Sequence, residues 1–263
     1  MEETIMAKWA AFPYAGEYPF DTRRVQQQWA LLHAGDLEPL PSDAQLLHGW
    51  AQYHSGEFQA AARCGIKLGP KGFNLANKAT CVYATYLERN EERRLALFLE
   101  VAQRAEQQIA ANSANLNAYY WRAYALSRYS QGISVAKALA QGLGVKIKTD
   151  LEKVIRHQPK HLDAHVALGM FHAEVIDKVG SLIGAMAYGA NKDVGKNLFT
   201  RAVQLNIASA LCMVDQAQAL LMLEGEAMLN EAMRLYREAA GIAPLDAAQR
   251  LEVEMARARL NEA

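Results

Sequence analysis

One row of side chains has the residue types and the spacing to bind a carboxylate. Tyr120, Tyr124 and Arg128 stand at positions i, i+4 and i+8, so they share one face if this segment is helical. The guanidinium group of Arg128 can hold a carboxylate through two parallel hydrogen bonds. The row therefore predicts a charged anchor for a ligand.

A second row has the same spacing further along the chain. It consists of Val166, Met170 and Glu174, with Lys178 one helical turn beyond. If the two segments are aligned helices of adjacent repeats, Arg128 and Glu174 fall at neighbouring places. Two interpretations stay open, a structural ion pair between repeats and a charged anchor at the mouth of a cavity.

Histidines and cysteines give little support for catalysis or metal binding. Four histidines lie close together in the sequence: His157, His161, His165 and His172. A proline separates the first two, and the last two fall where helical repeats place packing aromatics, so we expect structural histidines and no metal site. Cys64, Cys81 and Cys212 have no CxxC spacing, and no phosphate-binding glycine loop is present. We expect no cofactor and no enzymatic activity.

The elements that position these residues are helices of a repeat. The segment from His161 to His172 follows Pro159 and carries Leu168 and Gly169 at the positions typical of the first helix of a tetratricopeptide repeat, where a small residue lets two helices cross closely. A second copy runs from Ala118 to Arg128. The sequence shows no sustained strand-like alternation, so the expected fold class is all-α, a tetratricopeptide-like helical repeat (α-solenoid).

The expected organisation is an arm followed by a repeat domain. The arm covers residues 1–43, is rich in proline and aromatic residues, and contains one short helix. The repeat domain covers residues 44–263 and ends in a charged, alanine-rich capping helix. Its expected repeats are 44–76 and 77–112, which match poorly, 115–159 and 161–207, which carry insertions, and 208–263, which includes the cap.

Two repeats are longer than the standard unit of about 34 residues. The added matter is glycine-containing in both, at Gln131–Gly144 and at Lys178–Lys192, and its mostly apolar parts are Ser134–Gly144 and Ser181–Ala190. Insertions at one place in successive repeats emerge on the same side of a solenoid, so these two are expected to be neighbours. They could line a ligand cavity, with Met186 and Tyr188 in contact with the ligand, or pack together as core, or form an oligomer interface.

Composition excludes several classes of partner. The chain has 263 residues, of which 51% are hydrophobic, and its 28 basic residues balance 28 acidic ones. This balance argues against nucleic acid as a partner, and no membrane span is expected. The first residues do not resemble a secretory signal, so the expected location is the cytoplasm, or the periplasm if a leader has been removed.

One family resemblance is more specific than the repeat pattern. Arg128–Gly142, Ala164–Gly180 and Ala187–Ala190, within a region from Asn115 to Ala240, resemble the T-component (TatT-type) proteins associated with TRAP transporters. The resemblance implies a helical-repeat protein with a pore-like cavity that binds a small apolar or amphipathic ligand, docks a ligand-binding partner protein, and can self-associate. Members of that family are typically periplasmic lipoproteins, and this sequence lacks their lipid-acceptor cysteine.

The sequence thus predicts a non-enzymatic binding protein. The first hypothesis is a T-component-like module whose ligand contacts are Tyr120, Tyr124, Arg128, Met170, Glu174, Lys178, Met186 and Tyr188. The alternative is a general tetratricopeptide scaffold for protein–protein interaction.

Overall fold

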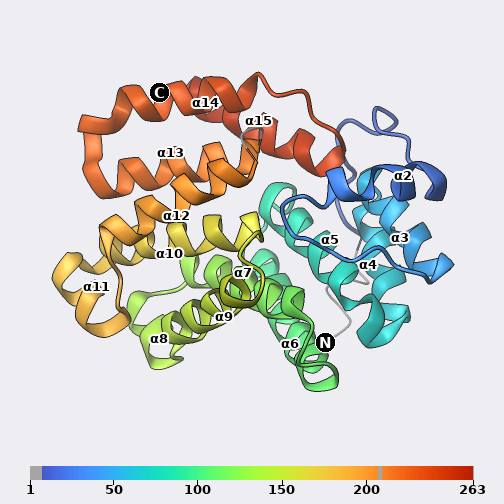
Figure 1. The fold of residues 1–263 in the computed structure, drawn as a ribbon, viewed down its shortest axis with the longest axis horizontal. Helices are drawn as coiled ribbons and strands as arrows, with labels where there is room; N and C mark the ends of the chain where they lie inside the picture. The colour runs from blue at the N-terminus through green and yellow to red at the C-terminus, as the bar shows by residue number, and fades with distance from the viewer. Residues whose placement is uncertain (1–7, 207–208, 263) are drawn as a thin grey trace. The chain divides into compact units, whose positions relative to one another are not determined.

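A computed structural model describes residues 8–206 and 209–262 (Figure 1). The first seven residues of the expected arm, residues 207–208 between the last two expected repeats, and residue 263 at the end of the cap lie outside this description. Within the described ranges all regular secondary structure is helical, which confirms the all-α class. The α-helices are α2 (Thr22–Leu32), α3 (Ala44–His54), α4 (Phe58–Lys67), α5 (Phe73–Tyr86), α6 (Glu91–Ala111), α7 (Leu116–Gln131), α8 (Val135–Ala140), α9 (Leu143–His157), α10 (Leu162–Val179), α11 (Ser181–Tyr188), α12 (Lys192–Leu205), α13 (Ala210–Glu224), α14 (Leu229–Ala240) and α15 (Ala247–Glu262), with two short 3₁₀ helices, η1 (Gly69–Gly72) and η2 (Gly225–Met228).

The helices form two compact units. The first contains residues 8–33, Leu37–His157 and Asp246–Ala248, and the second contains Ala34–Asp36, Gln158–Leu245 and residues 249–262. No helix in the described ranges is both long enough and apolar enough to cross a bilayer.

The first unit is built from helix pairs. Helix α3 packs on α4, α5 on α6, and α7 on α9, and the two helices of each pair are joined by a short or inserted connection. The first helices of successive pairs also contact one another, α3 with α5 and α5 with α7. They therefore make one layer of the unit, and α4, α6 and α9 make the other, which is the arrangement of a helical-repeat protein.

Local sequence explains where these helices begin. Asp43 caps α3, because its carboxylate accepts hydrogen bonds from the backbone N–H groups of Gln45 (2.9 Å) and Leu46 (3.1 Å). Asn90 caps α6 and Asn115 caps α7 in the same way. Polar side chains at these positions satisfy backbone donors that a helix leaves free at its first turn.

The second unit repeats the design. Helix α10 packs on α12 and α13, and α13 packs on α14. Gly169 lies where α10 crosses α12, and a Cβ atom added there would come within 2.7 Å of the Phe199 ring. The small residue that the sequence pattern required at this crossing is therefore explained by contact with a buried aromatic side chain.

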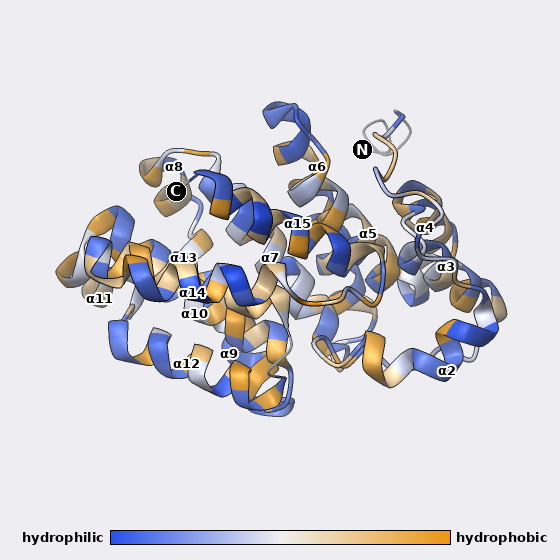
Figure 2. Cartoon of the chain, turned by 90° about the horizontal axis from the view of Figure 1, so that it is seen from above, coloured by the Kyte–Doolittle hydropathy of each residue, from blue (hydrophilic) through white to orange (hydrophobic). Residues whose placement is uncertain are grey.

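The two insertions form short exposed helices. They are α8 in the first unit and α11 in the second, and both are apolar. Figure 2 shows hydrophobic residues on both of them. Leu182 and Met186 in α11 are 74% and 81% exposed, so this insertion is not core of its own unit.

The glycines of these insertions have a backbone explanation. Gly142, Gly180 and Gly189 have φ values of +63°, +80° and +62°, which side chains other than glycine rarely adopt. Gly142 immediately precedes α9, Gly180 separates α10 from α11, and Gly189 ends α11. The expected elongated insertions and the C-terminal helix, α15, are thus confirmed. The expectation that the insertions are neighbours stays a prediction.

Candidate functional site

Three of the predicted ligand-binding residues lie together on α7. The Tyr120 and Tyr124 rings are 6.1 Å apart, and the guanidinium carbon of Arg128 lies 5.2 Å from the centre of the Tyr124 ring. Tyr124 forms a hydrogen bond of 3.0 Å with the Thr85 hydroxyl, and burial raises the pKa of its phenol. The structure therefore brings these three side chains together, with Tyr120 only 2% exposed.

The other five predicted residues lie in the second unit. Met170 is buried in a core cluster with Phe199, and Glu174 is also buried. Lys178 and Met186 are exposed, and Tyr188 is half-buried. The eight residues are thus divided between two units, and a common ligand site stays a prediction, as does the ion pair between Arg128 and Glu174.

A different site is evident in the first unit, where the arm packs on the repeat helices. Trp9 stacks on Tyr83 of α5 with ring centres 4.1 Å apart, and Phe12 meets Phe58 of α4 edge to face at 5.9 Å. The Tyr83 hydroxyl also accepts a 3.2 Å hydrogen bond from the backbone N–H of Ala10. These contacts hold the start of the arm against α4 and α5.

Gly56 permits this close approach of the arm. It lies in the turn between α3 and α4 with a φ of +86°, and a Cβ atom at this position would clash with the Phe12 ring. Glycine is therefore required both by the backbone conformation and by the aromatic side chain that packs over it.

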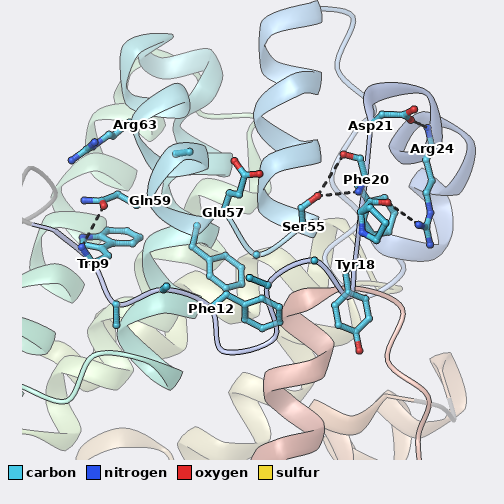
Figure 3. A pocket seen from close by; sticks show the side chains of 18 residues that line it. Trp9, Phe12, Tyr18, Phe20, Asp21, Arg24, Ser55, Glu57, Gln59 and Arg63 are labelled. Atoms are coloured by element: carbon cyan, nitrogen blue, oxygen red, sulfur yellow. Dashed lines mark hydrogen bonds between the residues drawn. The ribbon is translucent and has the colours of Figure 1, made fainter.

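The arm and the α3–α4 turn enclose a groove of about 830 Å³ (Figure 3). This volume falls within the range of about 300–1,000 Å³ that is typical of ligand sites. Trp9 and Gln59 lie at one end in the figure, Phe20 and Arg24 at the other, with Phe12 between them. The charged and polar lining residues are Asp21, Arg24, Ser55, Glu57, Gln59 and Arg63.

Several polar groups along the groove form hydrogen bonds within the protein. The Ser55 hydroxyl accepts a 3.0 Å hydrogen bond from the backbone N–H of Phe20, and Arg24 donates to the Pro19 carbonyl at 2.7 Å. Trp9 is 5% exposed, and its indole N–H has no hydrogen-bond partner among residues 8–206 and 209–262. A buried donor without a partner is uncommon in proteins.

The sequence analysis described the arm as rich in proline and aromatic residues and did not place a site there. The arm's aromatic residues are spaced irregularly, so no helical or strand period shows which of them face a groove. The sequence feature that could have indicated the site is the cluster of proline and aromatic residues in the arm, together with the later Ser55–Gly56–Glu57 turn.

A buried Asp–His–His cluster in the same unit is structural. The Nδ1 atom of His54 lies 2.5 Å from a carboxylate oxygen of Asp246, and its Nε2 atom lies 3.4 Å from Nε2 of His33. Trp29 stacks on His33 at 4.1 Å. His54, His33 and Asp246 are 0%, 2% and 3% exposed, so none can reach a substrate from solvent in this conformation.

The residues first considered for metal or thiol chemistry also have structural positions. No group of three or more potential metal ligands occurs within residues 8–206 and 209–262. His161 caps α10, and its Nδ1 atom accepts a 3.1 Å hydrogen bond from Ala164. Burial raises the pKa of the Cys212 thiol to about 12 and also raises those of Cys64 and Cys81, the opposite of what an activated nucleophile needs.

Comparison with known proteins agrees with this architecture. A crystal structure of a thermophilic tetratricopeptide-repeat protein from Thermus thermophilus is similar, with a TM-score of 0.56 and 18% sequence identity over 81% of this chain and 97% of that one. The fold is tetratricopeptide-like. The family profile described as Regulator of microtubule dynamics protein 1-3 matches residues 73–179, from the start of α5 to the end of α10.

A comparison with curated proteins gives no match. Neither of the two similarities above is to a TRAP T-component, so that resemblance stays a prediction.

Proposed function

We propose that this protein is a non-enzymatic interaction scaffold that binds an extended segment of a partner protein in the groove between the arm and α4. Tetratricopeptide-like solenoids present surfaces suited to peptide segments. The observation that carries the proposal is the groove itself, with its aromatic lining and its polar residues of both charge signs.

The chemistry of the groove indicates the kind of segment. Tyr18 and Phe20 line the groove and are half-buried, so their rings offer surface for one or two apolar side chains of the partner. Arg24 and Arg63 stand with Asp21 and Glu57 along the same groove, so charge of both signs is available at its rim. An extended peptide with an apolar side chain between polar residues fits this arrangement.

Site-specific photo-crosslinking in cells tests the proposal. Benzoylphenylalanine is introduced at Tyr18, which lines the groove, and at Gln103, an exposed residue of α6, as the matched control. We expect one or a few discrete protein adducts from position 18 that are absent at position 103. Identical adduct patterns at both positions, or none at position 18, would contradict the assignment.

The T-component resemblance supports a second proposal, the binding of a small apolar or amphipathic ligand by the residues predicted from the sequence. Two of these side chains, Tyr124 and Arg128, pack on each other at 5.2 Å, which is compatible with an anchor for a carboxylate. Native mass spectrometry of the purified protein separates the two proposals, because a co-purified small molecule is expected only from the second. Its loss in Arg128→Ala would assign the ligand to Arg128.

A further inference from the structure

Two asparagine side chains on adjacent helices of the first unit hold a carboxylate. Asn74 lies in the first turn of α5, and its amide donates to both carboxylate oxygens of Glu38, at 3.0 and 2.8 Å. Asn117 lies in the first turn of α7 and donates to one of the same oxygens at 2.6 Å. Asn115, the cap of α7, joins the cluster through hydrogen bonds of 3.3 and 3.4 Å with Asn74.

The donors belong to the helix layer, whereas the carboxylate comes from a connecting segment. Asn74 and Asn117 are 5% and 4% exposed, and they occupy the same place in two helices that pack side by side. Their amides are therefore held rigidly by the repeat framework. Glu38 comes from the segment between α2 and α3, which has no regular secondary structure.

This segment lies on the surface of its unit. Pro39 is exposed, Leu40 is 46% exposed, and Leu37 and Glu38 are half-buried. The segment is held to the helices by the Glu38 side-chain contacts and by a 2.7 Å hydrogen bond that the Trp29 indole donates to the Glu38 backbone carbonyl. Pro39 and Pro41 keep it extended, because proline fixes φ and cannot donate a backbone hydrogen bond.

The backbone at this place is strained. Leu37 has a φ of +49°, the one positive value among non-glycine residues in the described ranges. A leucine in this region is an outlier that persists only when surrounding contacts impose it. The Glu38 carboxylate on the asparagine pair, next in sequence, is such a contact, so release of the segment would also relieve the strain.

The electrostatic setting favours an anion. The positive ends of the α5 and α7 helix dipoles lie at the first turns that carry Asn74 and Asn117. Lys78 follows Asn74 by one turn on the same face of α5, over the rings of Trp50 and Tyr53 at 5.9 and 5.4 Å. Side-chain amides that donate to a carboxylate form charge-assisted hydrogen bonds, which are stronger than neutral ones.

We propose that the Asn74–Asn117 pair is a binding site for an acidic side chain of a partner protein segment, and that Glu38 occupies it as an internal ligand. The partner's acidic residue would displace Glu38 and lift the Leu37–Pro41 segment from the surface. This second surface is separate from the arm groove and shares with the proposed function only the assumption that the partner is a peptide segment.

A peptide that copies the internal ligand tests this inference. The probe is a fluorescent, N-acetylated and C-amidated peptide with the sequence of residues 37–42, Leu-Glu-Pro-Leu-Pro-Ser, whose only carboxylate is that of the glutamate. It is titrated against the full chain and against a linker variant that carries Leu37→Gly, Glu38→Ser, Pro39→Gly, Leu40→Ser and Pro41→Gly. An internal ligand competes at a high effective concentration, so the wild type should bind poorly.

We expect the linker variant to bind the peptide at least tenfold more tightly than the wild type does. A peptide with glutamine in place of glutamate should bind the linker variant at least fivefold more weakly, and Asn117→Ala added to the linker variant should remove binding. Gln107→Ala on the exposed face of α6 is the matched control and should change nothing. Ala60→Trp, which fills the arm groove, should also leave this binding unchanged, so the two sites are tested independently.

Equal affinity of the wild type and the linker variant, or of the glutamate and glutamine peptides, would overturn the inference. The absence of saturable binding to a linker variant with the helical circular dichroism of the wild type would overturn it as well. If the linker variant is not folded, Glu38→Ala is titrated in its place and the same criteria apply.

Discussion

Replacement of Gly169 by leucine tests the repeat register at the crossing of α10 and α12. An added Cβ atom would lie 2.7 Å from Cε2 of Phe199 and 3.0 and 3.1 Å from two further ring carbons. Carbon atoms in contact are ordinarily about 3.5–4.0 Å apart. The ring would therefore have to move by nearly 1 Å.

Phe199 has little room for such a movement. It is 3% exposed and belongs to a buried cluster with Ala202, Cys212 and Ala219. Overpacking a close-packed core costs about 1–3 kcal/mol, whereas replacing a helical glycine by alanine contributes about 1 kcal/mol of helix stability. We expect a net loss of about 1 kcal/mol for Gly169→Ala, and about 3 kcal/mol for Gly169→Leu, which adds three further carbons.

Urea and thermal unfolding, followed by circular dichroism, measure these losses. A loss of about 3 kcal/mol lowers the melting temperature by about 6–12 °C in a protein of this size. Gly184→Ala is the matched control, because its nearest neighbour is Val175 Cγ1 at 3.2 Å and that side chain is only half-buried, so we expect a change of less than about 1 kcal/mol. Phe199→Leu combined with Gly169→Ala should lose less than the sum of the single losses. If the Gly169→Leu variant unfolds at the same urea concentration and temperature as the wild type, the assignment of this crossing is refuted.

Further predictions concern other parts of the chain. Ala185→Trp adds bulk to an exposed position of α11, so the unfolding free energy should change by less than about 0.5 kcal/mol. A fall of several degrees in the melting temperature would show instead that this position is closely packed. Burial lowers the pKa of His165 below its ordinary value of 6.5, so the unfolded chain binds more protons as the pH falls below that value and stability decreases. Urea unfolding at about pH 7 and about pH 5 should show this decrease, and His165→Gln should reduce it. The pKa values of the Cys64, Cys81 and Cys212 thiols are raised, so the folded protein should be alkylated slowly at about pH 8. Rapid labelling of one thiol in the folded protein would contradict this and would indicate an activated cysteine.

Much of the fold could be predicted because a helical repeat leaves a periodic signal. Gly169 and Ala123 mark helix crossings where a side chain has no space, and Pro159 follows the end of a helix. Such positions are set by local geometry that each repeat copies. The all-α class, the solenoid architecture and the two insertions were therefore readable from the sequence alone.

The site could not be predicted in the same way. The groove depends on contacts between residues far apart in the sequence, such as Trp9 with Tyr83, and no periodic pattern encodes a loop that packs on a helix. Glu38 lies 79 residues from Asn117, and only the fold shows that they meet. The apolar insertions were expected to line a cavity, to pack as core or to form an oligomer interface. Helix α11 packs on α10 and yet leaves Leu182 and Met186 exposed.

The central claim is that the arm groove binds extended segments of other proteins. Selection of peptides that bind the purified protein tests this claim most directly. Random twelve-residue peptides are selected on the wild type, and the dissociation constants of the best binders are then measured for the wild type, for Ala60→Trp in the groove, and for Ala110→Trp on the exposed face of α6. We predict that the best peptides contain an aromatic or aliphatic residue flanked by polar ones, and that Ala60→Trp weakens their binding at least tenfold while Ala110→Trp leaves it unchanged. Peptides that bind all three proteins equally, or a selection that yields no binder, would contradict the account.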